Sequence, residues 1–461
     1  MEKRDLVLGV FGGGVVGGGV QQLVKKCMGN GRFGQLGFNM KISKICVRNL
    51  QKKRDYEVNL ATTTFVTDFN SILGDPEINV VVEVMGGITD ARDVVYSAIR
   101  ANKHVVTANK ALVAAYLPEI KALLKLHPQV QFAYEAAVCG AIPVIHSLQT
   151  DFVSDSITSV VAIANGTTNF MLCKMEQEGA SYSDVLREAQ DLGFAEADPT
   201  ADVEGLDVQA KISIMAKLAY GAEVASAAVP TQGISALATE DFAYAKSRLN
   251  STIKLLGIAN YSGSGSGSGS ICVYVSPHFV PLSHPLASAK GPGNMVIITS
   301  ENMGGDSPTV LAGPGAGRFP TANSIINDLV RIAQGTCPAP FPLDFPLATD
   351  NNFHAQFYVR VPLHAPADAD ADADPDYHIY AECPLVREQV LNCANDATHA
   401  SSGITSQDVA IIVDSGILGP GSMYLHTRNM SLKELHAMIN RLCDSRLCAG
   451  KPVWIPILPL P

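Results

Sequence analysis

The chain has 461 residues, is 47% hydrophobic and carries a formal net charge of −10. A chain of this length is too long to fold around a single hydrophobic core, so we expect two or three domains. The acidic balance argues against nucleic-acid binding, no apolar run approaches the roughly 20 residues that cross a bilayer, and the N-terminus lacks the pattern of a signal peptide, so we expect a cytoplasmic protein.

Short apolar runs alternate with helical patterns over the first 150 residues. The runs are too continuous for a half-exposed sheet, and strands of this kind are buried on both faces. They lie at residues 6–12, 41–47, 78–85, 103–108 and 130–136. Alternation of strand and helix predicts a doubly wound parallel sheet, that is, an α/β Rossmann domain over residues 1–140 that a helix near 321–335 completes.

The pattern changes after residue 140. An alternating run at 156–166 is followed by three helical segments and then by further strands, with the low-complexity tract SGSGSGSGS at 262–270 between them. We expect a mixed α/β domain over 141–320. Residues 350–461 contain the tract ADADADADPD and a strand–strand–helix pattern, which predicts a small α+β module.

A glycine loop follows the first strand and opens a helix. Gly12, Gly14 and Gly17 fit G-x-G-x-x-G, with Val15 and Val16 between the last two glycines. Such a loop lets a pyrophosphate approach backbone N–H groups, although glycine clusters also form plain turns. We predict dinucleotide binding here.

The second strand ends at a basic segment. Rossmann domains that select NAD usually carry an acidic residue there, whereas this chain has Arg48, with Lys52, Lys53 and Arg54 behind it. Cations suit the 2′-phosphate of NADP, so we favour NADP and leave NAD possible. The alternative is a solvated basic loop.

An acidic segment precedes a lysine in the middle of the chain. The carboxylates before Lys211 are Glu196, Asp198, Asp202, Glu204 and Asp207. Asp207 and Lys211 are four residues apart on a predicted helix and therefore share a face. Apolar neighbours such as Ile212 and Ile214 indicate that this helix is buried, and a buried amine needs a carboxylate partner to keep its proton. A surface ion pair is the alternative.

With these pieces in place, the chain resembles homoserine dehydrogenase. The resemblance covers residues 6–335, and its segments occur in the family's order. They are GVFGGGVVGGGV, VVVEVMGGITDAR, NKHVVTANKALVA, YEAAVCGAIPVI, ANGTTNF, AEADPTADVEGLDVQAK and GPGAGRFPTANSIINDL. The resemblance implies interconversion of L-aspartate 4-semialdehyde and L-homoserine with NAD(P), in the route to threonine and methionine.

The resemblance also implies roles for individual residues. Lys211 matches the family's catalytic lysine, and Lys110 matches a second lysine between nicotinamide and substrate. Glu196 matches the glutamate that binds the substrate, with Asp202 and Asp207 as acids beside it.

A second group of residues concerns the substrate carboxylate. Asn165, Gly166 and Thr167 end a strand and start a helix, so they offer donors to that carboxylate, although an ordinary helix cap is the alternative. Phe170 stands where the family has tyrosine, which removes one hydroxyl near the substrate pocket.

The remaining implied sites bind cofactor and cation. Gly86 and Gly315 match cofactor-binding segments, Gly315 in the loop that closes on the cofactor. A monovalent cation (Na or K) would be held by Glu135 and backbone carbonyls; the alternative is that Glu135 caps the next helix. The residues that supply the carbonyls are Val138, Gly140 and Ile142.

The resemblance implies a homodimer or homotetramer, and the C-terminal region looks only loosely like a regulatory ACT module. Two rival functions stay open from the sequence. One is a Rossmann oxidoreductase that acts on another amino-acid semialdehyde, and the other is a non-catalytic NADPH sensor. Four residues argue against a sensor, which needs no such set: Lys110, Glu196, Asp207 and Lys211.

Overall fold

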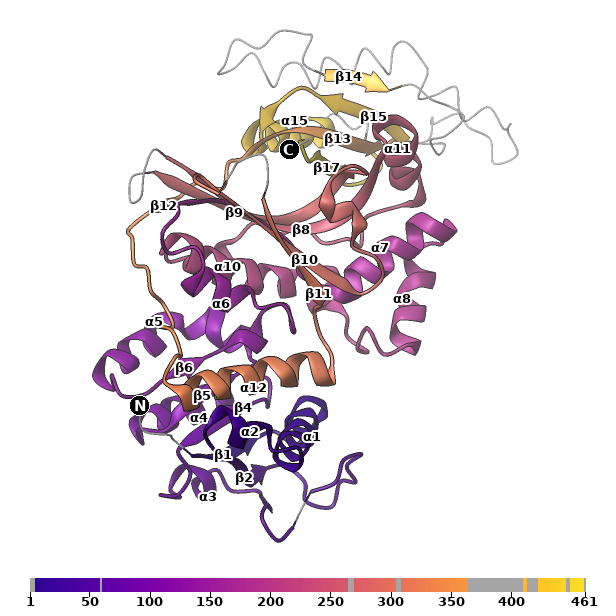
Figure 1. Cartoon of the computed structure of the whole chain (residues 1–461). Coiled ribbons are helices and arrows are strands. Elements are labelled where there is room, and N and C mark those ends of the chain that lie inside the picture. Colours follow the sequence, from indigo (N-terminus) through magenta and orange to yellow (C-terminus); the bar gives the residue numbers. More distant parts are fainter. Residues whose placement is uncertain are drawn as a thin grey trace.

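The structure is a computed structural model that describes residues 5–58, 60–263, 269–303, 308–363, 409–412, 422–444 and 448–459. Most of the SGSGSGSGS tract and the whole ADADADADPD tract lie outside these residues. Figure 1 shows the N-terminal sheet with its helices at one end of the molecule and a larger sheet at the other, with helices between them.

The N-terminal sheet is parallel throughout, with the strand order β3-β2-β1-β4-β5-β6. Its strands are β1 (Leu6–Phe11), β2 (Met40–Cys46), β3 (Thr64–Val66), β4 (Val80–Glu83), β5 (His104–Thr107) and β6 (Phe132–Ala133). This confirms the predicted doubly wound sheet. The three-residue strand β3 was not predicted, because an edge strand of that length leaves no apolar run in the sequence.

Helices cover both faces of this sheet. They are α1 (Val15–Gly29), α2 (Arg32–Leu36), α3 (Asn70–Leu73), α4 (Thr89–Arg100), α5 (Lys110–Leu126) and, from much later in the chain, α12 (Arg318–Gln334). Helix α12 lies beside α1 (Figure 1). Gly19 makes that approach possible, since a Cβ there would lie 2.7 Å from the Arg318 carbonyl oxygen.

The second sheet has eleven strands within the described residues and is mixed. Its first strands are β7 (Ile157–Ile163), β8 (Ser251–Ser262), β9 (Ser270–Pro281), β10 (Gly293–Ser300) and β11 (Thr309–Pro314). The later ones are β12 (Ala348–Thr349), β13 (His354–Pro362), β14 (Val409–Ile412), β15 (Ser422–Thr427), β16 (Met430–Ser431) and β17 (Val453–Ile457). The long strand β8, which the sequence analysis did not single out, forms an antiparallel hairpin with β9.

The C-terminal strands continue this sheet. β17 pairs in parallel with β9, where Ile457 lies opposite Phe279, and β13 pairs with β17. The proline-rich C-terminal segment therefore supplies the strand that connects β13 to β9. A buried ion pair adds to the junction, because Arg360 of β13 donates its Nε–H to Asp241 at 3.0 Å.

The helices of the second half lie mostly between the two sheets and on the outer flank of the second. They are α6 (Val144–Thr150), α7 (Gly166–Glu178), α8 (Tyr182–Asp191), α9 (Thr200–Val203), α10 (Leu206–Tyr220), α11 (Thr239–Leu249) and α15 (Leu432–Asp444), with short 3-10 turns η1 (Glu135–Ala137), η2 (Ser226–Ala228) and η3 (Pro285–Ser288). Helix α10 packs on β7, β8 and β9 on one side and approaches α5 and α6 on the other. Gly257 of β8 permits this, since a Cβ there would lie 2.8 Å from Val208.

Candidate active site

The first two turns of α10 hold the predicted acid and lysine together. Lys211 Nζ donates to Asp207 Oδ2 at 2.8 Å and to the carbonyl oxygen of Ala164, at the end of β7, at 2.6 Å. Both side chains are buried, with 10% and 7% of their surface exposed. The predicted shared face is thus a buried ion pair between α10 and the end of a strand.

A second lysine reaches the same carboxylate from the N-terminal domain. Lys110 is the first residue of α5, and its Nζ lies 2.9 Å from Asp207 Oδ1. This contact is an ion pair without hydrogen-bond geometry, and Asp207 Oδ1 has no hydrogen bond to a described residue. The Lys110 side chain is 40% exposed, so of the two amines it is the more accessible to solvent. Lys110 and Asp207 are 97 residues apart in the sequence, and their side chains meet at the boundary between the two domains.

Burial and charge oppose each other at this pair. Burial by itself would raise the pKa of Asp207, but the charges of Lys211 and Lys110 outweigh it and hold the pKa well below its usual range. For Lys211, burial by itself would lower the pKa, while the Asp207 charge raises it above the ordinary value. At neutral pH, therefore, Asp207 is ionised and Lys211 is protonated.

Asn165 connects the acids of this site. Its Nδ2 donates to Asp202 Oδ1 at 2.7 Å and to Asp207 Oδ2 at 2.8 Å, and its Oδ1 accepts the Thr168 N–H at 2.8 Å. The last contact makes Asn165 the N-cap of α7, which is the alternative role that the sequence left open for this segment. Asn165 fills both roles at once. Burial, as the main cause, raises the pKa of Asp202.

The other predicted substrate-binding residues are placed differently. Gly166 packs against Pro292, whose carbonyl oxygen would lie 2.8 Å from a Cβ, and the Thr167 hydroxyl donates to the Phe194 carbonyl at 2.7 Å. Glu196 is exposed, and among the described residues its carboxylate makes no hydrogen bond or ion pair. The structure does not bring Glu196 into the Asp207 cluster.

The structure also places Phe170, the residue that stands where the family has tyrosine. Phe170 is nearly buried, and its ring centroid lies 4.8 Å from that of Phe194. An aromatic pair thus occupies the position next to the Asn165 cap.

The glycine loop has the close contacts that its pattern predicts. Gly12 has a φ of 115°, and a Cβ there would lie 2.5 Å from the Val84 carbonyl oxygen. A Cβ on Gly17 would lie 2.0 Å from the Gly12 carbonyl oxygen. Gly14 is the N-cap of α1, with no side chain over the first turn, and Val15 is 59% exposed. The first backbone N–H groups of α1 are therefore open to an anion.

Gly86 also lies at this edge of the sheet. It follows β4 with a φ of 75°, and no atom lies within 4 Å of a Cβ placed there. β1 and β4 are adjacent strands of the doubly wound sheet. Folds of this type bind nucleotides at the carboxyl ends of such strands.

The basic segment contains one residue whose position the sequence could not give. Arg48 is exposed, as predicted for a ligand-facing or solvated cation. Arg54 instead folds back, donates to the carbonyls of Asn49 and Lys52, and lies with its guanidinium 4.4 Å from the Phe65 ring centroid. Its Nε would lie 3.2 Å from a Cβ on Gly13, so the guanidinium borders the glycine loop. This contact spans the loop between β2 and β3.

The residues predicted for a cation show the alternative that the sequence left open. Glu135 accepts the N–H groups of Ile145 and His146, both at 2.9 Å, and so caps α6. Burial and the nearby Asp328 charge raise the pKa of Glu135 to about 7. Within the described residues, no group of three or more His, Cys, Asp or Glu side chains is arranged to hold a metal ion.

The carbonyl oxygens of this segment have protein donors. The Gly140 oxygen accepts from the Ser324 hydroxyl at 2.8 Å, and the Ile142 oxygen accepts the Val144 N–H at 2.8 Å. Val138, which precedes both residues, is fully buried. A carbonyl oxygen has a second lone pair, so these contacts leave room for a cation without requiring one.

Gly315 meets this segment at close range. A Cβ on Gly140 would lie 2.5 Å from the Gly315 carbonyl oxygen, and the Ala141 N–H donates to Pro314 at 3.1 Å. Cys139, which directly precedes Gly140, has a φ of 55°, and this backbone conformation is strained for a residue with a Cβ. The predicted cation segment and the predicted closing loop are therefore one packed unit.

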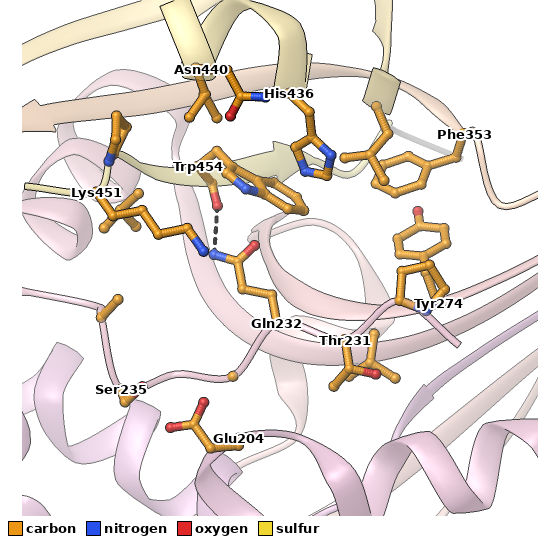
Figure 2. A pocket seen from close by; sticks show the side chains of 18 residues that line it. Glu204, Thr231, Gln232, Ser235, Tyr274, Phe353, His436, Asn440, Lys451 and Trp454 are labelled. Carbon is orange, nitrogen blue, oxygen red and sulfur yellow. Dashed lines mark hydrogen bonds between the residues drawn. The ribbon is translucent and has the colours of Figure 1, made fainter. Parts of the chain in front are cut away.

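A separate cavity of about 590 Å³ lies between the second sheet and the C-terminal helix α15 (Figure 2). Gln232 donates from its Nε2 to the Trp454 carbonyl at 3.1 Å across it, and Glu204 lies on the side away from Trp454. Neither Lys211 nor Asp207 lines this cavity. It is thus distinct from the lysine–aspartate site, although Glu204 precedes α10 by two residues.

Two family models match the chain: "Homoserine dehydrogenase" over residues 143–330 and "Homoserine dehydrogenase, NAD binding domain" over residues 12–134. The homoserine dehydrogenase of Bacillus subtilis is 42% identical over 331 residues, which are 72% of this chain and 73% of that protein. The chain belongs to the homoserine dehydrogenase family. It is an NAD(P)-dependent oxidoreductase of amino-acid biosynthesis that acts on a small molecule.

Other relatives agree with this assignment. The homoserine dehydrogenase of Synechocystis is 40% identical over 70% of this chain and 72% of that protein. Among solved structures, a homoserine dehydrogenase from Thiobacillus denitrificans superposes with a TM-score of 0.81 at 30% identity, covering 99% of this chain and 98% of that one. In the part of the chain that the structure describes, no helix is both long and apolar enough to cross a membrane.

Proposed function

We propose that this homoserine dehydrogenase prefers NADP and that Lys211 is the proton donor and acceptor of its reaction. The bound nicotinamide supplies or accepts the hydride. Reduction of the aldehyde of L-aspartate 4-semialdehyde leaves an alkoxide, and that oxygen needs one proton to become the hydroxyl of L-homoserine. A protonated amine, held in place and shielded from water, both stabilises the alkoxide and donates to it.

The Asp207–Lys211 ion pair is the observation that carries this assignment. Lys211 Nζ is fixed by Asp207 and by the Ala164 carbonyl, which leaves its third N–H for a ligand. Asp207 keeps the amine protonated between turnovers. In the oxidative direction, Lys211 accepts the hydroxyl proton, which requires that it first lose its own proton to solvent.

Lys110 is a second candidate for the same proton. It shares Asp207, and its greater exposure suits exchange with solvent. We propose that Lys110 helps to deliver protons to the Lys211–Asp207 pair. Its place at the start of α5, in the N-terminal domain, makes this link depend on how the two domains sit together.

For the substrate we propose contacts at both charged ends. Glu196 would take the ammonium group, with Asp202 behind it, and Asn165, Gly166 and Thr167 would face the carboxylate. The second contact is supported by the start of α7, where the backbone N–H groups of Gly166 and Thr167 belong to the first helical turn. For Glu196 the support is the family motif and a free, exposed carboxylate, and the contact requires the 193–199 segment to turn toward the ligand.

For the cofactor we propose that Gly12, Gly14, Val15, Val16 and Gly17 hold the pyrophosphate and that Gly86 and Gly315 border the nicotinamide half. The open first turn of α1 supports the first contact. The preference for NADP is supported by two cations, exposed Arg48 and, beside the glycine loop, Arg54. A monovalent cation near Glu135, Val138, Gly140 and Ile142 is a further proposal, supported by the left-handed turn there.

The remaining proposals concern the whole protein. We propose a cytoplasmic homodimer or homotetramer, with a cofactor domain over 1–140, a catalytic and dimerisation domain over 141–320, and an ACT-like region over 350–461.

One assay tests the cofactor proposal. Nicotinamide absorbance is followed with L-homoserine and with NADP or NAD in parallel. We expect turnover with both and a higher kcat/KM with NADP. A higher kcat/KM with NAD would contradict the preference.

A further inference from the structure

Asn294 is a buried amide that the roles above do not use. It lies near the start of β10, opposite Gly313 of β11, and its surface is only 2% exposed. Among the described residues, neither its Nδ2 nor its Oδ1 has a hydrogen-bond partner. The amide does lie beside the Cys139 thiol, whose pKa is raised by burial and lowered by Lys211 and by Asn294. A thiol is a weak partner, so most of the amide's hydrogen-bonding capacity is unused.

A buried amide without partners destabilises a folded protein, because it loses its hydrogen bonds to water and gains none. Native structures satisfy nearly all such groups, and each exception calls for an explanation. Replacing Asn294 by an apolar residue would remove the unmet need in this state. The residue therefore acquires a role if a second state of the site provides its partners.

The covering segment shows where those partners come from. A Cβ on Gly315 would lie 2.0 Å from Asn294 Nδ2 and 2.4 Å from its Oδ1, so only glycine fits there. Gly315 is buried, while Pro314, Ala316 and Gly317 around it are exposed. The peptide groups on either side of Gly315 are therefore adjacent to the amide.

The same segment connects the two halves of the site. It leads directly into α12, whose Arg318 packs against Gly19 of α1 behind the glycine loop. On its other side lie Gly140 and Cys139, and Cys139 is close enough to Lys211 to feel its charge. A change in the 314–317 segment is therefore felt both at the dinucleotide loop and near the reacting lysine.

We propose that Asn294 is a positioning residue: in the cofactor-bound enzyme, its amide hydrogen-bonds peptide groups of residues 314–317 and holds that segment against the site. The place of the cofactor in this inference rests on the proposed function. The role of Asn294 is then to make order in the segment depend on bound cofactor.

The test compares wild type with Asn294→Ala in three measurements. NADPH affinity is followed by nicotinamide fluorescence, amide hydrogen exchange is measured at residues 313–318, and Tm is recorded with and without cofactor. For Asn294→Ala we expect an NADPH Kd and a cofactor KM raised about tenfold, with kcat within about twofold. In wild type NADPH protects 313–318 from exchange, and in Asn294→Ala that protection is lost. Without cofactor, the Tm of Asn294→Ala equals or exceeds that of wild type.

Two further variants complete the design. Asn294→Asp keeps the size and the acceptors but loses the donor, so it shows an intermediate or full loss of NADPH affinity. Met295→Leu changes the next residue of β10, which points to the opposite face, and leaves affinity and exchange unchanged.

A purely structural Asn294 predicts the reverse: a lower Tm without cofactor and an unchanged NADPH Kd, and that result overturns the proposal. If Asn294→Ala does not fold, wild type still decides, because an absence of cofactor-dependent protection at 313–318 is incompatible with the proposal. These readouts need no turnover, so a failure of the assigned Lys211 chemistry would be seen separately, as activity that survives without Lys211.

Discussion

Lys110 and Lys211 lie on the two oxygens of one carboxylate, 2.9 Å from Asp207 Oδ1 and 2.8 Å from Asp207 Oδ2. Lys110 is the first residue of α5, which covers the N-terminal sheet, and Lys211 belongs to the buried helix α10. Asp207 is thus the point at which the two halves of the enzyme share a charge. Because its pKa is held low, the carboxylate is ionised at neutral pH.

The first prediction concerns the pH profile. In Asp207→Asn the charge that raises the Lys211 pKa is gone, and burial then lowers that pKa. We expect kcat for aldehyde reduction to fall by roughly 100-fold, and its basic limb to move to lower pH. The measurement is kcat from pH 6 to 10. Asp198→Asn, an exposed turn acid in the same segment, should keep the wild-type profile, and a wild-type profile in Asp207→Asn would contradict the assigned pairing.

The second prediction separates the two roles of Asn165. Asn165→Ala removes an N-cap, which costs about 1 kcal/mol, and also removes both donors to Asp202 and Asp207. Ser181→Ala removes the cap of α8 and nothing in the site. Asn165→Ala should lose more unfolding free energy than Ser181→Ala, because it also takes donors from the buried Asp207, and it alone should lose kcat, by roughly tenfold or more. Equal kinetics in both variants would reduce Asn165 to a helix cap.

The third prediction addresses cofactor choice. Arg48→Ala removes an exposed cation at the end of β2, so the ratio of kcat/KM for NADP to that for NAD should fall about tenfold, as expected for loss of one charged contact to a phosphate. Arg32→Ala, an exposed arginine of the short helix α2, serves as the matched control. An unchanged ratio in Arg48→Ala would favour the solvated-loop interpretation or assign the preference to Arg54.

The fourth prediction is a pH dependence of stability. Glu135 has a folded pKa of about 7, raised by burial and by Asp328, with Arg331 and the Ile145 and His146 N–H groups acting against the rise. A carboxyl group with a raised folded pKa contributes its stability in full below the unfolded pKa, near 4.5, and loses it as pH rises to about 7.

The measurement is the unfolding free energy of wild type and Glu135→Gln at pH 5 and pH 8. The difference between the two proteins should shift against wild type by up to about 3 kcal/mol between these pH values. Asp328, with a pKa raised by burial to about 6, is coupled to Glu135, so the difference reports the titration of the pair. If a monovalent cation binds here, KCl should reduce that shift relative to choline chloride. A difference that does not change with pH would contradict the buried-acid account.

The sequence predicted the parallel sheet well because continuous apolar runs such as Val80–Glu83 are typical of strands buried on both faces. It also predicted that Asp207 and Lys211 share a helix face, since that follows from their spacing. It did not predict β8, whose burial depends on the packing of α10 over Gly257. Nor could local patterns show that β17 would join the C-terminal strands to β9.

Long-range contacts set the limit for the site as well. Nothing near Lys110 in the sequence indicates that it meets Asp207, and the amide of Asn294 becomes visible only when Gly315 is seen to cover it. Glu196 shows the opposite case. Its motif predicts a residue that binds substrate, and in the structure its side chain is exposed to solvent.

The central claim is that Lys211 carries the reacting proton, and Lys211→Met tests it most directly. Methionine keeps much of the buried volume without the amine. Lys217→Met is the matched control, because Lys217 is a buried lysine of the same helix with carboxylate partners of its own, Glu223 and Asp344. The measurement is kcat with L-homoserine and NADP, together with the NADPH Kd. We predict a loss of 10²–10⁴-fold in kcat for Lys211→Met at an unchanged Kd, with Lys217→Met near wild type in turnover. Wild-type turnover by Lys211→Met with normal NADPH binding would contradict the account.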